Sequence, residues 1–127
     1  MLELEAVDAG YGATTILHGV SLNVQAGEAV TAIGGNGAGK TPTLRTIALL
    51  IRPTSGSIRF EGQDITRLEA HEVVELGITL IPEGRQLFPD MTVRENLLMG
   101  AFRRKAREQA EATLKEVLQL FPRVAER

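Results

Sequence analysis

The 127-residue sequence has no cysteine and no tryptophan, and aromatic residues make up only 4% of it. The absence of cysteine excludes disulfide bonds and thiolate metal sites within these residues. The longest apolar run is the segment 47–51, far short of the roughly 18 residues that a membrane-spanning helix needs. No signal peptide is recognisable at the N-terminus, so a cytoplasmic location is the expectation.

The sequence also lacks an excess of either charge, with 14 basic and 16 acidic residues and a formal net charge of -2. Nucleic-acid-binding domains present a strongly basic surface, so nucleic acid is not an expected partner. Affinity for phosphate would therefore have to come from one local site rather than from an overall field. The length is enough for one domain with a buried core.

What the sequence does contain is a glycine-rich segment that matches the phosphate-binding pattern G-x-x-x-x-G-K-[ST] at every fixed position. Glycines let the backbone bend so that several N–H groups converge on phosphate oxygens. The lysine then reaches the terminal phosphates, and the last hydroxyl can hold Mg²⁺. The segment consists of Gly34, Gly35, Asn36, Gly37, Ala38, Gly39, Lys40 and Thr41.

The flanks of this segment favour a phosphate site over a chance glycine-rich turn. Residues 28–33 predict a short buried strand and residues 42–50 predict a helix, which is the order that the pattern requires. The N-terminus of such a helix adds the positive end of its dipole to the site.

Hydrophobic patterning predicts an α/β domain. Residues 1–9 and 15–25 alternate between apolar and polar, which predicts two strands of an antiparallel sheet ahead of a parallel core. A turn signal at 52–56 precedes a short strand at 57–60. The apolar run 78–81 is typical of a buried parallel strand.

Two further helices are predicted. Residues 65–76 form the first, as a helix or a pair of turns, and Gly77 ends it. Thr92 begins the second as its N-cap, with Glu95 as its capping-box partner. Apolar residues recur at helical spacing through 106–121, and this face serves either packing within the chain or docking of a partner.

Tyr11 is the only tyrosine, and it lies between two glycines where an exposed turn is expected. A nucleotide held by its phosphates needs a flat apolar surface for its base, which an aromatic ring supplies. His18 and His71 are interpreted as structural and solvated, respectively. Glu83 follows the 78–81 run at the edge where ligands of α/β sheets bind, but the residues alone do not distinguish it from a solvated loop glutamate.

Together, Tyr11, the phosphate loop, the segment 52–58 and the segment 87–97 resemble the N-terminal half of an ABC-transporter ATP-binding subunit. The likeness covers almost the whole chain. It is most similar to the LivF-type subunit of branched-chain amino acid importers. In that group the Q-loop glutamine is commonly replaced by glutamate, as in Pro82-Glu83-Gly84-Arg85 here.

The resemblance implies an α/β fold with a P-loop NTPase (ABC ATPase) core. An N-terminal antiparallel β part would cover residues 1–27, the P-loop core through the Q-loop residues 28–91, and the start of a helical subdomain residues 92–127. The family's signature loop, Walker B strand and switch histidine are not found in the 127 residues, so we expect the sequence to stop before that strand. Since Walker B lies beside residues 29–33 in the family fold, we also expect an open edge and uncovered apolar surface there.

The resemblance also implies residue roles. Tyr11 would stack on adenine, Ile16 would lie beneath the sugar, and residues 34–41 would contact the phosphates of ATP or ADP. Thr41 and Glu83 would lie at Mg²⁺. No complete catalytic set is present, and Lys40 and Glu83 would contribute to one. The implied partners are transmembrane permease subunits and a second ATP-binding subunit, in a homodimer or a heterodimer, at the inner face of the cell membrane.

The implied function is that of an ATP-binding subunit that powers an importer of branched-chain or other hydrophobic amino acids. The 127 residues are expected to bind nucleotide without hydrolysing it. One alternative is a non-catalytic nucleotide-binding or interaction module. Another is an ATPase of the same family that serves lipid or lipopolysaccharide export, against which Glu83 in place of glutamine argues.

One residue departs from the family pattern, because Pro42 stands where serine or threonine is usual. Proline has no N–H, so one donor expected at the α-phosphate is missing, and its ring disfavours helical geometry at Thr41. In the first helical turn it costs no intrahelical bond, so the helix should persist. Nucleotide binding is therefore expected to be weakened rather than abolished.

Overall fold

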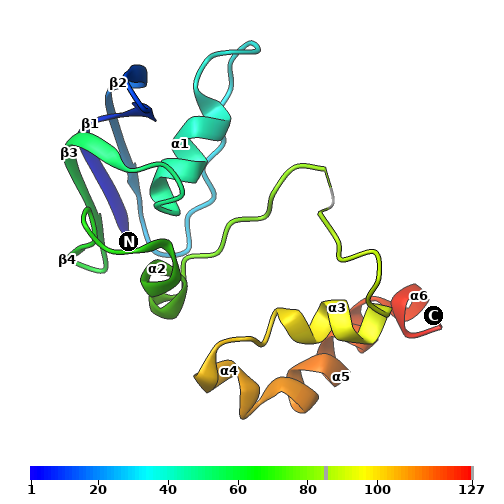
Figure 1. The fold of residues 1–127 in the computed structure, drawn as a ribbon. Coiled ribbons are helices and arrows are strands. Elements are labelled where there is room, and N and C mark those ends of the chain that lie inside the picture. The colour runs from blue at the N-terminus through cyan, green and yellow to red at the C-terminus, as the bar shows by residue number, and fades with distance from the viewer. Residues whose placement is uncertain (85, 127) are drawn as a thin grey trace. The chain divides into compact units, whose positions relative to one another are not determined.

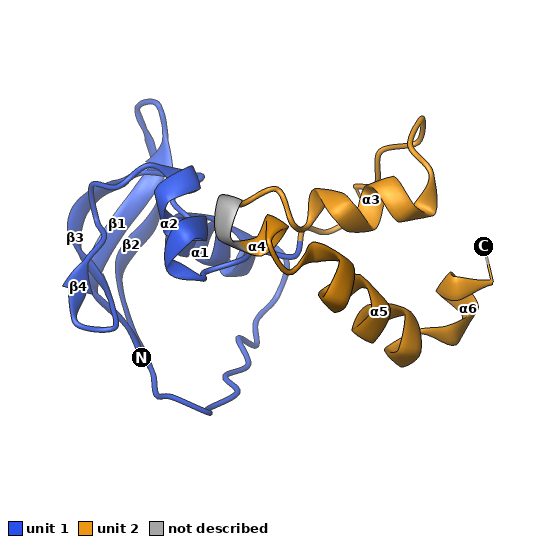
Figure 2. Ribbon diagram, turned by 90° about the horizontal axis from the view of Figure 1, so that it is seen from below, with its two compact units in different colours: residues 1–81 blue, residues 82–127 orange. Residues whose placement is uncertain are grey.

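The structure, a computed structural model, describes residues 1–84 and 86–126, so Arg85 and Arg127 lie outside the described residues. The chain forms two compact units, residues 1–81 and residues 82–127, which Figure 2 colours separately. The predicted division into three parts, with boundaries at residues 27 and 91, is based on the parts of the family fold and not on compact units. It stays a prediction.

The first unit is built on a four-stranded antiparallel sheet with the order β2-β1-β3-β4 (Figure 1). Its strands are β1 (Leu2–Tyr11), β2 (Thr14–Val24), β3 (Pro53–Phe60) and β4 (Gln63–Asp64). Two helices, α1 (Lys40–Ile47) and α2 (Ala70–Leu76), lie on the same side of this sheet. The predicted antiparallel pair is confirmed, and the strand predicted at residues 57–60 lies within β3, whereas β4 was not predicted.

Apolar side chains attach the helices to the sheet. The main cluster of buried residues draws on β1, β3 and both helices, and consists of Leu4, Val7, Ile47, Leu49, Ile58, Ile65 and Val73. A second cluster joins Ala9 of β1, Leu17 of β2 and Ile51, which follows α1. Burial of each large aliphatic side chain stabilises the unit by roughly 1.5–3 kcal/mol. The end of α1 is thereby fixed to the strands that lead to Tyr11.

The Asp8 carboxylate joins three neighbouring strands where the ladder of β1 is irregular. It accepts hydrogen bonds from the Gly19 N–H of β2 at 2.6 Å and from the Ser55 hydroxyl of β3 at 2.7 Å. The Ser55 hydroxyl, followed by the Gly19 amide, holds the pKa of Asp8 below its ordinary value. One ionised side chain therefore stabilises the irregular middle of the sheet.

The turn predicted at residues 52–56 is wrong, because β3 begins at Pro53 and runs through this segment. Gly56 has a φ of 78°, and a Cβ there would lie 2.4 Å from the carbonyl oxygens of Glu5 and Ala6. The ladder between β1 and β3 shifts register at the same place. The glycine therefore marks a bulge where two strands approach closely, and not a reversal of the chain.

The two predicted strands of the parallel core are not formed. Residues 28–33 and 78–81 have no strand assignment, and within the described residues no strand pairs with either segment. Ile33 is 93% exposed and Ile81 is 89% exposed. A buried parallel strand needs paired neighbours and cover on both faces, which these residues do not receive. The expected uncovered apolar surface at residues 29–33 is observed, but the expected open strand edge is not, because the segment forms no strand.

The helix predicted at residues 65–76 is confirmed only from Ala70, where α2 begins. It ends as predicted, because Gly77 is the C-cap and has a left-handed φ of 105°. Glu69 and Glu72 form a capping box at its N-terminus. In the part of the chain that the structure describes, none of the helices has the length and apolar character of a membrane span.

The second unit is helical and comprises α3 (Val93–Met99), α4 (Arg104–Arg107), α5 (Ala110–Leu120) and α6 (Pro122–Ala125). The predicted capping box is confirmed, since Thr92 Oγ1 accepts the Glu95 N–H and the Glu95 carboxylate accepts the Thr92 N–H. An ion pair between Arg94 and Glu111 joins α3 to α5, and Leu114 is buried. The apolar residues predicted at helical spacing through 106–121 lie mainly on two separate short helices, α4 and α5.

We expect Ser55→Ala to raise the pKa of Asp8 towards its ordinary value, because the Ser55 hydroxyl is the main cause of the lowered pKa. A lowered pKa stabilises the fold above the unfolded value of about 3.9, and this contribution is lost as pH falls through the folded pKa. The melting temperature of the variant should therefore depend less on pH across that interval.

NMR titration of the carboxyl carbons measures the change directly. Asp64 is the internal control, because the hydroxyl of Thr66, not that of Ser55, is the first cause of its lowered pKa. An Asp8 titration that is the same in the parent and the variant would contradict the assignment.

Candidate functional site

The phosphate loop, residues 34–41, runs into the N-terminus of α1 (Figure 1). The helix begins at Lys40 and ends at Ile47, so it is shifted towards the loop relative to the predicted range of 42–50. The predicted loop and helix are therefore present. The segment that precedes them, residues 28–33, is not a strand, as described above.

Gly39 is the N-cap of α1 and has a left-handed backbone, with φ 84° and ψ 4°. A Cβ on this residue would lie 3.0 Å from Cδ2 of Leu17 on β2. Both the left-handed conformation and this close contact favour glycine. The end of the loop is therefore seated on the sheet, where Leu17 belongs to the second core cluster.

The Lys40 ammonium reaches back across the loop. Its Nζ donates hydrogen bonds to the carbonyl oxygen of Gly34 at 2.6 Å and to that of Gly35 at 2.8 Å. The loop is also closed by a hydrogen bond of 3.2 Å from the Ala38 N–H to the Gly35 oxygen. These contacts hold a full positive charge against the backbone of the phosphate loop.

The N-terminus of α1 has neither a side-chain cap nor an acidic residue in its first turn. The first N–H groups of an α-helix have no partner within the helix and carry a partial positive charge. Together with the Lys40 ammonium they form a donor set that matches phosphate oxygens. The site is therefore suited to the polyphosphate of a nucleotide.

Pro42 is the third residue of α1, and the helix continues through it as predicted. Thr41 lies inside the helix, so the expected disturbance of its helical geometry is not observed. The next residue, Thr43, secures the turn, because its N–H and its hydroxyl both donate to the Gly39 oxygen, at 2.9 and 2.8 Å. Pro42 therefore differs from the serine or threonine of the family pattern only in lacking a backbone N–H donor and a side-chain hydroxyl, and not in disrupting the helix.

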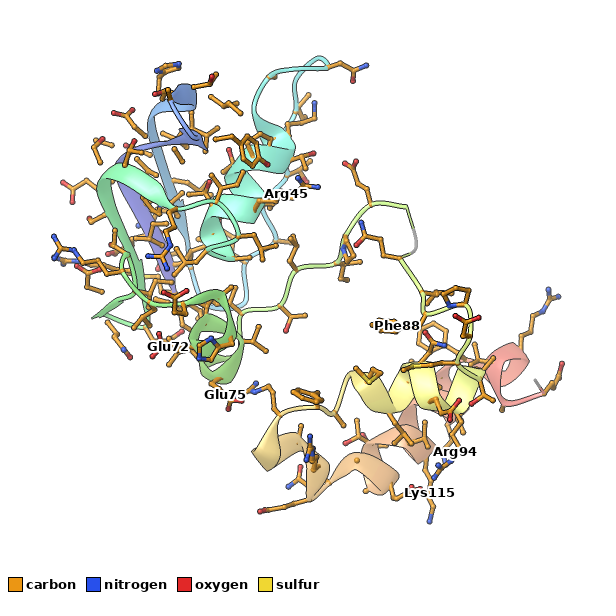
Figure 3. The ribbon with its side chains drawn as sticks, in the orientation of Figure 1. Arg45, Glu72, Glu75, Phe88, Arg94 and Lys115 are labelled. Carbon is orange, nitrogen blue, oxygen red and sulfur yellow. The ribbon has the colours of Figure 1, made fainter. Side chains whose placement is uncertain are left out.

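Tyr11 ends β1 and is 50% exposed, in agreement with the prediction of an exposed aromatic residue. Its hydroxyl accepts a hydrogen bond of 3.2 Å from Arg45 Nη1. Arg45 lies in the last turn of α1 and is labelled in Figure 3. The structure thus links Tyr11 to the helix that follows the phosphate loop. Arg45 cannot be recognised from the sequence, because a basic residue on a predicted helix carries no distinguishing signal.

Ile16 is the extra residue of a β-bulge in β2. Ala9 pairs with Leu17 and Gly10 pairs with Thr15, so Ile16 has no partner position in the ladder. A bulge redirects the side chain that it contains. Ile16 directly precedes Leu17, the residue that Gly39 of the phosphate loop approaches closely. Ile16 is half-buried. Its predicted position beneath the sugar of a nucleotide stays a prediction.

Glu83 belongs to the second unit, where it forms a turn with Gly84. Arg85, which completes the motif, lies outside the described residues. The predicted Mg²⁺ site combines Glu83 with Thr41 of the first unit, so it remains a prediction.

The family model described as ABC transporter matches residues 17–125. The high-affinity branched-chain amino acid transport ATP-binding protein BraG of Pseudomonas aeruginosa is 42% identical over 127 residues, which is 100% of this chain and 54% of that protein. The Fe(3+) ions import ATP-binding protein FbpC of Brucella abortus is 42% identical over 118 residues, covering 89% of this chain and 33% of that protein. The chain therefore spans about half, or less, of the length of these relatives.

Solved structures show the same fold. The ATP-binding subunit of an ABC transporter superposes with a TM-score of 0.77 at 30% identity, covering 100% of this chain and 52% of that one. A dimeric ATP-binding cassette in a post-hydrolysis state, bound to ADP and phosphate, superposes with a TM-score of 0.72 at 26% identity, covering 91% of this chain and 56% of that one.

Proposed function

Because the chain belongs to the ABC transporter family of ATP-binding proteins, we propose that it is the nucleotide-binding part of a subunit that powers an importer. The observation that carries this proposal is the phosphate loop, in which Lys40 lies against the Gly34 and Gly35 carbonyls at the uncapped N-terminus of α1. The activity, solute and partners of a whole protein of this family are part of the proposal, because the chain spans about half of its relatives.

The proposed solute class is branched-chain or other hydrophobic amino acids. Support comes from the similarity to BraG, which extends over the full chain, whereas the equally identical iron-import relative matches a shorter stretch. The Pro82-Glu83-Gly84-Arg85 motif also supports this solute class, because it resembles the pattern of LivF-type subunits. Solute selectivity itself would reside in other subunits.

In this proposal, different residues bind the phosphates, the base, the sugar and the Mg²⁺ of the nucleotide. The backbone from Gly34 to Gly39 and the first turn of α1 would hold the phosphates of ATP or ADP, with Lys40 as the cation. Tyr11 would stack on the base and Ile16 would contact the sugar. Mg²⁺, which neutralises charge on the phosphates, would be held by Thr41 and Glu83.

The partners would be transmembrane permease subunits and a second ATP-binding subunit, and the protein would work at the cytoplasmic face of the membrane. A dimeric relative bound to ADP and phosphate supports association of two ATP-binding subunits. Hydrolysis in this family is completed by elements that residues 1–127 do not contain, namely the signature loop, the Walker B strand and the switch histidine.

The alternative is a nucleotide-binding or interaction module without catalysis. Reading the coding sequence beyond Arg127 separates the two functions. A signature loop followed by an apolar strand that ends in Asp-Glu supports the energy-coupling subunit, and a stop codon supports the module.

Pro42→Thr should tighten ATP binding by about ten-fold, or about 1.4 kcal/mol, because it restores a backbone donor to a charged phosphate. Calorimetric titration of the parent and the variant measures this change. The matched control is Pro122→Thr, which makes the same substitution in the first turn of α6 and should leave ATP affinity unchanged. Equal ATP affinities of the parent and Pro42→Thr would show that the missing N–H of Pro42 does not weaken binding.

The 127-residue chain should bind ATP without turning it over, since the elements that position water are not within it. Phosphate release measured with Mg²⁺ should therefore remain at background, while Lys40→Ala should abolish binding. Lys115→Ala removes the same charge from an exposed position on α5, and this variant should bind ATP like the parent. Sustained phosphate release that Lys40→Ala abolishes and Lys115→Ala preserves would contradict the prediction.

A further inference from the structure

We propose that Arg45 is a positioning residue for Tyr11, which it holds by the ring edge so that the ring face stays available to a purine base. The inference rests on the nucleotide-binding function proposed above and identifies the side chain that orients its aromatic ring. It starts from the hydrogen bond of 3.2 Å between Arg45 Nη1 and the Tyr11 hydroxyl.

The hairpin itself gives the Tyr11 ring little support. Its sequence neighbours, Gly10 and Gly12, have no side chains, and its cross-strand partner Thr14 is exposed. Tyr11 is 50% exposed. Side chains of exposed residues change rotamer within picoseconds to nanoseconds unless a contact restrains them. For Tyr11 one such contact is the hydrogen bond from Arg45, which lies outside the hairpin.

The backbone of Arg45 is fixed within the same unit, whereas its side chain is exposed. The N–H groups of Leu50 and Ile51 donate to its carbonyl oxygen at 2.9 and 3.3 Å. The following residues, Thr46 and Ile47, are buried, and Ile51 packs with Ala9 of β1. The hydrogen bond to Tyr11 therefore joins two exposed side chains whose backbones belong to one packed unit, so each side chain restrains the other.

The geometry of the bond suits a base-binding ring. The phenol oxygen lies at the ring edge, so a donor there covers neither face. The guanidinium is permanently charged and donates only, and the phenol O–H remains able to donate to another group. Restraining the ring before a base arrives lowers the conformational entropy that is lost on stacking.

A first test uses the spectroscopy of the chain, which has one tyrosine and no tryptophan. Fluorescence excited at wavelengths that phenylalanine does not absorb therefore reports the Tyr11 ring alone. Without nucleotide, Arg45→Met should increase the fast phase of the fluorescence anisotropy decay, and Arg45→Lys, which retains a donor, should restore part of the restraint. The matched control is Arg94→Met on α3, which removes the same charge from an exposed helix and should not change the decay (Figure 3).

A second test separates the base from the phosphates by titrating ATP and inorganic tripolyphosphate. Arg45→Met should weaken ATP binding by roughly two- to five-fold, as expected for an exposed charged contact, and leave tripolyphosphate affinity unchanged. Tyr11→Phe keeps the ring but removes the acceptor, so it should weaken ATP binding equally. The double variant should be no weaker than either single one, because both remove the same interaction.

The outcomes distinguish the positioning role from the function on which it rests. If the parent binds ATP but Arg45→Met leaves the anisotropy decay unchanged, the positioning role is overturned alone. The same holds if Arg45→Met weakens ATP and tripolyphosphate equally, since Arg45 would then act on the phosphates. A parent that binds neither ligand overturns the nucleotide function and, with it, a role for Arg45 in base binding.

Discussion

The phosphate loop depends on the pair of hydrogen bonds from the Lys40 ammonium to the carbonyl oxygens of Gly34 and Gly35. They hold a cation against the loop at the N-terminus of α1, where helix N–H groups carry a partial positive charge. The left-handed backbone of Gly39 makes the transition into the helix possible, and its contact with Leu17 seats the loop on β2. The chemistry of the site therefore depends on how firmly α1 rests on the sheet.

The antiparallel sheet supplies that support, although its ladder is irregular. Asp8 joins β1, β2 and β3 through Gly19 and Ser55, at the place where the strands bulge. Beyond this point Ala9, Leu17 and Ile51 form the small core cluster that fixes the end of α1. The same unit carries Tyr11, for which we propose base stacking, Arg45, which hydrogen-bonds to it, and the phosphate loop. The relative placement of these three features therefore follows from the packing of one unit.

The sequence correctly predicted the elements that are stabilised by contacts between residues close in sequence. The spacing of Gly34, Gly39 and Lys40 predicted a loop that leads into a helix, and Thr92 with Glu95 predicted a capping box, because each involves only residues close in sequence. The strand at residues 28–33 was predicted from its apolar composition, yet Ile33 is exposed there. A parallel strand exists only when other strands pair with it, and this condition is not written in the segment itself.

The sequence by itself determined the phosphate loop, because a fixed spacing of glycines, a lysine and a hydroxyl has one well-known structural use. It also indicated the family, through four segments that occur together, and the exposure of Tyr11, through the two glycines that flank it. Tertiary structure alone decided that the glycine-rich segment at 52–56 is a bulge in β3, since the Gly56 backbone approaches Glu5 and Ala6. It also decided that Arg45 meets Tyr11, 34 residues away. Contacts at such separations depend on how helix and sheet pack, which no local pattern encodes.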